Sequence, residues 1–235
     1  MLALVFVVLF LVGVGLGAVP FAWLLVRLRH GLNLYAAGST NVGANNAYRV
    51  SGSRLLGALV LVLDLLKGVV AVGVGWAVWA VAATGFGTMP LPPGEAPLRF
   101  WCGAVPLLGA VAGHNYNPLL SVMAGRLVGG KGFAMAAGGF LLLTPWVVPS
   151  WLGLYAVGRR LFAWRRGLRD PIPGNVFATA LIPVVAGALY GGPAALAVGA
   201  FALLTLPKHA RQMQALLRAG SGDVRGEQES VNGDD

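Results

Sequence analysis

One uncharged stretch decides the fold class: residues 2–26 read LALVFVVLFLVGVGLGAVPFAWLLV. At about 1.5 Å of rise per residue, a helix of this length crosses the hydrocarbon core of a membrane. Arg27, Arg29 and His30 follow the stretch, whereas a cleaved signal peptide carries its positive charge before its apolar run. We therefore expect a retained transmembrane helix with the N-terminus outside and the loop up to Arg54 in the cytoplasm.

The composition of the whole chain agrees with an integral membrane protein. Of 235 residues, 57% are hydrophobic and 11% are charged, and the mean hydropathy is +0.75. This excludes a disordered chain and a nucleic-acid-binding module, so we expect no nucleic-acid partner. Cys102 is the single cysteine, which excludes an internal disulfide framework. The net charge of +9 reports on topology and on anionic ligands.

Two further apolar stretches, residues 55–83 and 100–120, are long enough to span the membrane. The loop between them is rich in Gly and Pro and carries Glu95 as its only charge up to residue 98, so we place it outside. Residues 133–157 form either one span or a hairpin of two short spans. We predict a hairpin that turns near residues 145–151, because it keeps the next five arginines in the cytoplasm: Arg159, Arg160, Arg165, Arg166 and Arg169.

A last pair of spans, residues 174–190 and 194–206, turns at Gly191-Gly192-Pro193. The sequence thus predicts an all-α integral membrane protein of about seven transmembrane helices, with the N-terminus outside and the C-terminus cytoplasmic. We expect a multi-pass protein of the inner (plasma) membrane. Residues 1–218 form a single transmembrane domain, and the polar tail of residues 219–235 is expected to be disordered.

The first candidate functional segment, residues 38–49, reads GSTNVGANNAYR. Glycines permit close backbone approach, and the side chains of Ser39, Asn41, Asn45 and Asn46 offer hydrogen-bond donors near the cation Arg49. This inventory suits a bound phosphate. The alternative is a flexible loop whose polar residues only cap the next helix.

The second candidate segment, residues 125–132, reads GRLVGGKG. Successive backbone N–H groups of Gly129, Gly130 and Gly132 can form an anion-binding nest, and Lys131 adds a point charge. An apolar helix beginning at Phe133 would add its positive N-terminus. The alternative is an ordinary basic loop at the cytoplasmic surface.

Two charges and one histidine lie within the predicted spans. Asp64 and Lys67 are three residues apart, hence on one helix face, and we interpret them as a structural pair lining the helix bundle. His114 either acts on a substrate phosphate or makes a structural hydrogen bond. No metal-ligand spacing and no serine-nucleophile motif is present, so we expect neither a metal nor a cofactor.

Four segments in one order resemble the bacterial membrane glycerol-3-phosphate acyltransferases that use acyl phosphate. They are GSTNVGANNAYR at 38–49, DLLKG at 64–68, GHNYNP at 113–118 and GGKGFAMAAGG at 129–139. The resemblance implies that Ser39 and Arg49 are catalytic. It also implies that Gly129, Gly130, Lys131 and Gly132 bind the phosphate of glycerol 3-phosphate, and His209 matches the histidine of a third family motif. Gln212 stands where that motif has Asn, and the segment from Arg165 to Asn175 replaces a loop rich in Arg and Ser.

The resemblance implies transfer of an acyl group from acyl phosphate to the 1-hydroxyl of glycerol 3-phosphate. The products are lysophosphatidate and phosphate, in the first step of phospholipid synthesis. Substrate binding is expected to involve Asn41, Asn45 and His114 as well, at a site facing the cytoplasm among membrane lipids. Two alternatives remain: a transporter of a phosphorylated metabolite, and a divergent acyltransferase that uses another polyol phosphate as acceptor.

Overall fold

The protein is described by a computed structural model that covers residues 1–84, 95–166, 170–210 and 213–214. Within these ranges the regular secondary structure is entirely helical. Helices or joined helix pairs that are long and apolar enough to cross a membrane occur at Leu2–His30, Arg54–Ala83, Ala96–Ala124, Pro171–Tyr190 and Gly192–Ala210. An all-α membrane protein is therefore confirmed.

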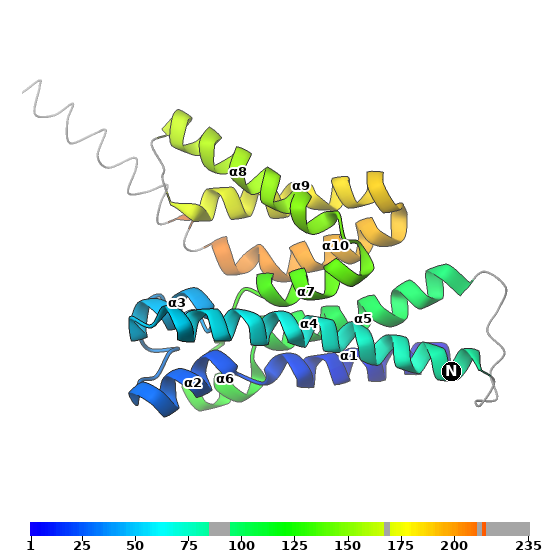
Figure 1. Cartoon of the computed structure of the whole chain (residues 1–235), viewed down its shortest axis with the longest axis horizontal. Helices are drawn as coiled ribbons and strands as arrows, with labels where there is room; N and C mark the ends of the chain where they lie inside the picture. Colours follow the sequence, from blue (N-terminus) through cyan, green and yellow to red (C-terminus); the bar gives the residue numbers. More distant parts are fainter. Residues whose placement is uncertain (85–94, 167–169, 211–212, 215–235) are drawn as a thin grey trace, which may run out of the picture.

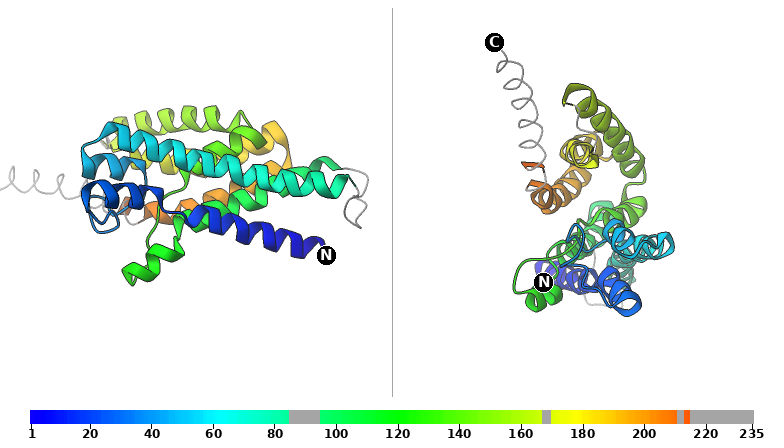
Figure 2. Two further views of the ribbon diagram at one scale, coloured as in Figure 1. Left: turned by 60° about the horizontal axis from the view of Figure 1, so that its bottom comes forward. Right: turned by 90° about the vertical axis from the view of Figure 1, so that its left-hand side faces the viewer.

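The helices form two groups (Figure 1). One contains α1 (Leu2–Ala18), α4 (Arg54–Ala83) and α5 (Glu95–Asn115), and the other contains α8 (Val147–Arg166), α9 (Pro171–Tyr190) and α10 (Gly192–Thr205). Helix α7 (Phe133–Leu143) lies between the groups, where it packs against α4 and α5 on one side and α8 on the other. Figure 2 shows the same division along the helix axes.

Three short helices gather at one end of the bundle: α2 (Phe21–His30), α3 (Ala44–Ser51) and α6 (Pro118–Ala124) (Figure 1). Helices α4, α7 and α9 begin at this end, and α5, α8 and α10 finish there. We call it the basic end, because most of the described cations lie in these terminal segments: Arg27, Arg29, Arg49, Arg54, Arg126, Lys131, Arg159, Arg160, Arg165 and Lys208.

Glycines allow the helices to approach closely. In α1, a Cβ at Gly13 or Gly17 would collide with the backbone of α5, and one at Gly109 or Gly113 of α5 would collide with α1. Lipid tails are as apolar as the helices, so the hydrophobic effect does not hold helices together within the bilayer. Close van der Waals contact between small residues holds such helices together instead. The glycine contacts between α1 and α5 thus fix the position of α5, including the end that carries His114.

The prediction that residues 2–26 form one continuous helix is wrong, although Leu2–His30 remains long and apolar enough to span a membrane. It breaks at Val19 and Pro20 into α1 and α2. Proline lacks an N–H group and pushes the preceding residue out of the helical region, and Val19 is accordingly extended, with φ −62° and ψ 111°. The Lys67 ammonium donates to the Val19 carbonyl, and the Asn117 amide donates to the Ala18 carbonyl at 2.8 Å, which satisfies oxygens freed by the break.

Residues 133–157 belong to two helices, α7 and α8, separated by residues 144–146. Helix α8 continues to Arg166, past the predicted end of its span. The count of seven spans is not confirmed, because α7 is short and α8 carries arginines in its last turns. Arg169 and the predicted disordered tail lie outside the described residues.

Candidate active site

A cavity of about 290 Å³ opens at the basic end, and we call it the polar cavity. It is lined by the loop before α3, by α3, α4 and α5, and by the beginnings of α7 and α9. The cavity is lined by eight of the residues that the sequence predicted: Ser39, Asn41, Asn45, Arg49, Asp64, His114, Lys131 and Gly132. The fold thus brings together the two glycine-rich segments that the sequence singled out.

Two helix N-termini face the polar cavity. The N-cap residues are Gly43 for α3 and Gly132 for α7, and neither helix has a side-chain cap. Both glycines line the cavity, together with the first residues of their helices. Backbone N–H groups at a helix N-terminus carry partial positive charge and bind anions. Arg49 on α3 and Lys131 just before α7 line the cavity as well and add two cationic side chains to it.

Asn46 holds the loop that carries Ser39. Its buried amide nitrogen donates to the carbonyls of Leu34 (3.2 Å) and Ala37 (3.0 Å), and its Oδ1 accepts from the Ser39 N–H at 2.9 Å. The sequence predicted Asn46 as a donor to phosphate, whereas its amide group instead organises this loop. A side chain that binds a loop 7 to 12 residues away leaves no local pattern.

His114 and its neighbour Asn115 shape the second glycine-rich loop. The Gly130 N–H donates to the His114 carbonyl at 2.9 Å, and the His114 ring occupies the space where a Cβ at Gly130 would lie. Asn115 donates to the Leu204 carbonyl at 3.1 Å, which ties the loop region to α10. The Val42 N–H donates to the Gly129 carbonyl at 3.0 Å, so the two candidate phosphate loops are hydrogen-bonded to each other.

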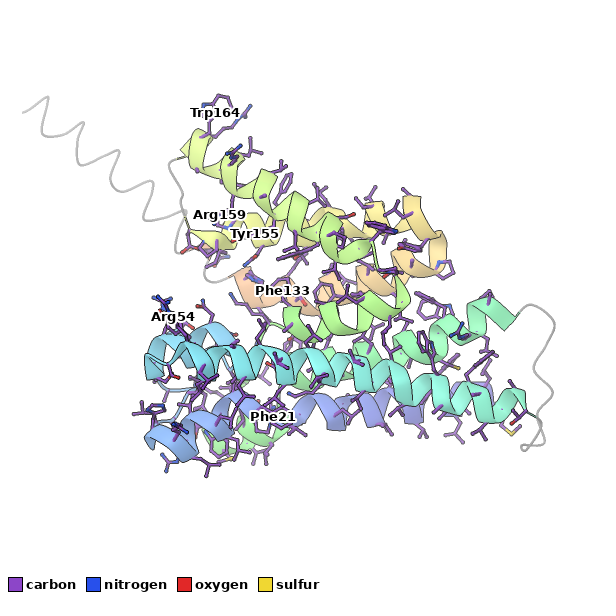
Figure 3. All side chains as sticks on the ribbon, in the orientation of Figure 1. Phe21, Arg54, Phe133, Tyr155, Arg159 and Trp164 are labelled. Atoms are coloured by element: carbon purple, nitrogen blue, oxygen red, sulfur yellow. The ribbon has the colours of Figure 1, made fainter. Side chains whose placement is uncertain are left out.

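Asp64 and Lys67 form a buried ion pair, with 2.9 Å between Oδ1 and Nζ. The His114 ring nitrogen Nδ1 lies 3.8 Å from the same carboxylate oxygen. The ammonium group also lies 4.9 Å from the ring centroid of Phe21, which Figure 3 labels. Asp64 faces the polar cavity, whereas Lys67 is directed to the break between α1 and α2.

Lys131 is half-buried and interacts electrostatically with Asp170 and Lys208. Burial lowers the pKa of Lys131 below its ordinary value, and Lys208 lowers that pKa further, whereas Asp170 raises it. Asp170 lines the polar cavity as the N-cap of α9, where its carboxylate accepts from the Ile172 N–H at 2.8 Å. Asp170 was not among the predicted site residues, although Asp followed by Pro is a common helix start.

Four predicted residues do not line the polar cavity: Lys67, Gly129, Gly130 and His209. Gly129 lines a neighbouring cavity of about 480 Å³ that also reaches Ser39 and Lys131. His209 is buried behind Phe133, at 5.5 Å between ring centroids, with its Nδ1 3.2 Å from the Thr205 carbonyl oxygen. The predicted catalytic role of His209 stays a prediction.

An apolar cavity of about 220 Å³ adjoins the polar one. It is enclosed by side chains of α7, α8, α9 and α10, among them Phe140, Trp151 and Phe201. Phe133 and Ala134 line both cavities, and Phe133 packs between the two helix groups, against Trp151 and Phe201 (Figure 3). An apolar chain and an anionic head group can therefore be held side by side.

These features define a helical membrane protein with a polar cavity, lined by Arg49 and Lys131, at one end of its bundle. The sequence profile of the family "Glycerol-3-phosphate acyltransferase" matches residues 7–219. The chain belongs to this glycerol-3-phosphate acyltransferase family.

Individual relatives agree with this assignment. A protein of Syntrophotalea carbinolica with the family's name is 34% identical over 213 residues, covering 90% of this chain and 94% of the relative. One of Anaeromyxobacter dehalogenans is 33% identical over 92% of both chains. The crystal structure of PlsY, an integral membrane glycerol 3-phosphate acyltransferase, in its glycerol 3-phosphate form has the same fold. Its TM-score is 0.64 at 24% identity over 93% of each chain.

Proposed function

We propose that the protein transfers an acyl group from acyl phosphate to the 1-hydroxyl of glycerol 3-phosphate, giving lysophosphatidate and phosphate. The observation that carries this proposal is the polar cavity, with its two uncapped helix N-termini, lying directly beside an apolar cavity. The reaction requires places for two phosphates and one hydrocarbon chain. Membership of the glycerol-3-phosphate acyltransferase family supports glycerol 3-phosphate as the acyl acceptor.

The residues of the cavity have distinct roles in this proposal. Arg49 with the N-terminus of α3, and Lys131 with the N-terminus of α7, each hold one phosphate. Asn41 and Asn45 donate to phosphate oxygens, and the backbone of Gly129, Gly130 and Gly132 shapes the nest around Lys131. His114 supports that nest from beneath Gly130.

Ser39 stabilises the transition state in this proposal. Its hydroxyl donates to the carbonyl oxygen of the acyl group, where negative charge develops. The acceptor oxygen forms the new C–O bond, and the bond from the carbonyl carbon to the phosphate oxygen breaks. Because acyl phosphate is already activated, no acyl-serine forms, and positioning of the two substrates supplies much of the rate.

The apolar cavity supports an acyl donor that remains in the membrane. The acyl chain lies between α7 and α8, and its carboxyl end reaches the polar cavity at Phe133 and Ala134. No charged side chain lines the apolar cavity in the described part of the chain, so it fits a hydrocarbon and not a metabolite.

We extend the proposal to topology. Residues 1–218 form one transmembrane acyltransferase domain of seven spans, in which α7 and α8 form the hairpin. The N-terminus lies outside the inner membrane, and the C-terminus and the polar cavity face the cytoplasm. The cluster of cations at the basic end supports this orientation, because cytoplasmic loops carry an excess of Lys and Arg.

The test is direct: purified protein in detergent receives acyl phosphate and glycerol 3-phosphate, and both phosphate release and lysophosphatidate are measured. Wild type should form both products in equal amounts. Ser39→Ala should lose about 10²-fold in kcat, the scale for one lost oxyanion donor. If no lysophosphatidate forms and protein-containing liposomes take up glycerol 3-phosphate, the protein is a transporter and the proposed function is wrong.

A further inference from the structure

A groove between α2 and α4 lies at the basic end, apart from the polar cavity. Its volume is about 380 Å³, and the residues that line it line neither the polar nor the apolar cavity. Helices α2 and α4 pack against each other here. We call it the leucine groove, because its walls are formed by Leu25, Leu28, Leu55, Leu56 and Leu59.

The leucine groove is open to the surroundings of the bundle. Leu28 is 75% exposed, Leu55 is 80% exposed and Leu59 is 44% exposed. Both α2 and α4 belong to segments that are long and apolar enough to cross a membrane. Exposed leucines on such segments lie against lipid, whose hydrocarbon tails are as apolar as leucine itself.

The leucine groove has one polar end, which lies toward the basic end. Helix α2 runs toward the basic end, so Arg29 lies nearer to that end than Leu25 does. Helix α4 begins at the basic end, so its N-cap Ser53 lies nearer to that end than Leu59 does, by about 9 Å along the helix. A phospholipid in the adjacent leaflet has the same order, with its phosphate first and its hydrocarbon deeper.

Arg29 and Ser53 are placed to bind a phosphate at this polar end. Arg29 is exposed, and no other residue of the described chain forms a hydrogen bond or an ion pair with it. The Ser53 hydroxyl accepts from the Leu56 N–H at 3.2 Å and still has its own hydrogen to donate. A guanidinium donates two parallel hydrogen bonds to a phosphate, which a hydroxyl group beside it can supplement.

The charge around the leucine groove favours a headgroup that is negative overall. Arg27 and His30 lie in the last turn of α2 with Arg29, and Arg54 follows Ser53. No carboxylate lines the groove in the described part of the chain. An anionic headgroup is attracted to these cations, whereas the ammonium group of a zwitterionic headgroup is repelled by them.

We propose that the leucine groove binds an anionic phospholipid of the leaflet at the basic end. Its phosphate accepts from Arg29 and Ser53, and one acyl chain lies along the leucines of α2 and α4. The bound lipid holds α2 against α4 on the side of α4 away from the polar cavity. This inference does not depend on the proposed acyl transfer.

A pair of arginine variants tests the phosphate contact. Native mass spectrometry of the full chain in detergent, titrated with phosphatidylglycerol, gives the affinity. Arg29→Gln should weaken binding by about tenfold or more, the scale for losing a hydrogen bond to a charged group. Arg27→Gln removes the same charge from the same helix turn, but Arg27 donates to the Gly31 carbonyl at 2.6 Å and does not line the groove. It should weaken binding by less than about threefold. Unchanged affinity in Arg29→Gln, or equal losses in both variants, would overturn the site.

A pair of tryptophan variants tests the acyl-chain contact. Leu59→Trp narrows the leucine groove and should weaken binding by about fourfold for each methylene group that the ring displaces. Leu66→Trp is the matched control, because Leu66 is 46% exposed on the same helix but does not line the groove. Equal affinities for the two variants would show that the acyl chain does not lie there.

Thermal unfolding of the wild type separates a lipid from a free anion. Phosphatidylglycerol should raise the unfolding temperature, and this rise should be lost in Arg29→Gln and kept in Arg27→Gln. Inorganic phosphate at the same concentration should have no such Arg29-dependent effect. An equal effect of inorganic phosphate would overturn the lipid assignment, and an equal effect of phosphatidylcholine would overturn the preference for an anionic headgroup. Failure of the acyltransferase assay would leave all these outcomes unaffected.

Discussion

The Lys67 ammonium donates to the Val19 carbonyl oxygen at 2.6 Å, although 48 positions separate the two residues. The contact lies at the break before Pro20, within the segment Leu2–His30 that is long and apolar enough to cross a membrane, where a carbonyl without a partner is costly. Asp64 neutralises the same ammonium. One residue of this ion pair, Lys67, thus binds the carbonyl at the helix break, and the other, Asp64, lines the polar cavity.

Replacing Lys67 by Met should destabilise the fold by about 3–5 kcal/mol, because it leaves a buried carboxylate unpaired. The variant also removes the Lys67 hydrogen bond to the Val19 carbonyl, which then accepts only from the Phe21 N–H. The double variant Lys67→Met with Asp64→Leu should recover part of this loss, since no charge is then left buried. Thermal unfolding in detergent measures both. A double variant less stable than the single one would contradict this account.

Gly130→Ala should lower activity by about tenfold or more, because the new methyl group collides with the His114 ring and displaces the loop that carries Lys131. Initial rates with glycerol 3-phosphate measure the effect. In a His114→Ala background the same substitution should cost less than about twofold, since the collision is gone. Gly153→Ala on α8, where a methyl group meets nothing within 4 Å, is the matched control.

Asn46→Ala should reduce both stability and activity. It removes the donor to the Leu34 and Ala37 carbonyls and the acceptor for the Ser39 N–H. The bond to Leu34 is buried, and a buried group left without a partner costs about 1–3 kcal/mol, whereas the Ala37 carbonyl still accepts from the Thr40 N–H. Asn45→Ala, at the exposed neighbouring position, should leave the unfolding temperature unchanged. Equal unfolding temperatures for the two variants would show that Asn46 does not organise the loop.

Arg49→Lys should raise KM for the phosphate-bearing substrates and lower kcat/KM by about 10²-fold. An ammonium group cannot reproduce the planar, two-pronged hydrogen bonding of a guanidinium. Steady-state kinetics with each substrate varied in turn would show which phosphate Arg49 holds. Unchanged kinetics for both substrates would remove Arg49 from the site.

Binding of glycerol 3-phosphate should weaken at alkaline pH. Burial lowers the pKa of Lys131, so this lysine loses its proton at a lower pH than an exposed lysine does. KM should therefore rise with pH in wild type and stay flat in Lys131→Arg, whose guanidinium remains charged.

Folding stability changes with pH in the opposite direction to substrate binding: it increases as pH rises through this range. The lowered pKa of Lys131 penalises the folded state at neutral pH, and the penalty disappears as pH rises from the folded-state value to that of the unfolded chain. Thermal unfolding across this alkaline window, compared with that of Lys131→Arg, would reveal it. A wild-type KM that stays flat through the window would contradict the placement of Lys131 at the phosphate.

Much of the architecture follows from apolar stretches and charge positions alone. Residues 55–83 lie within α4 (Arg54–Ala83), because a long and mostly apolar run has few alternatives in a membrane. The break at Pro20 was not foreseen, since a proline within a span is tolerated or not according to neighbours such as Lys67 and Asn117. Those neighbours are far away in the sequence.

The part of the site that consists of glycines and cations could be predicted from the sequence. Glycines beside Arg49 and Lys131 indicated anion binding, and the fold places both segments at one cavity. Asp170 was overlooked because a search for phosphate ligands selects cations and glycines. Whether His209 reaches the cavity depends on how α10 packs against Phe133, which no local pattern encodes.

The shared border of the two cavities at Phe133 and Ala134 has a kinetic consequence. Moving each methylene group of an acyl chain into water costs about 0.8 kcal/mol, so a long-chain donor stays in the bilayer throughout turnover. In the proposed reaction the protein therefore meets its acyl donor by lateral diffusion in two dimensions. Its velocity depends on the number of donor molecules per unit area of membrane, and diluting the bilayer with inert lipid slows turnover even when the bulk concentration of donor is unchanged.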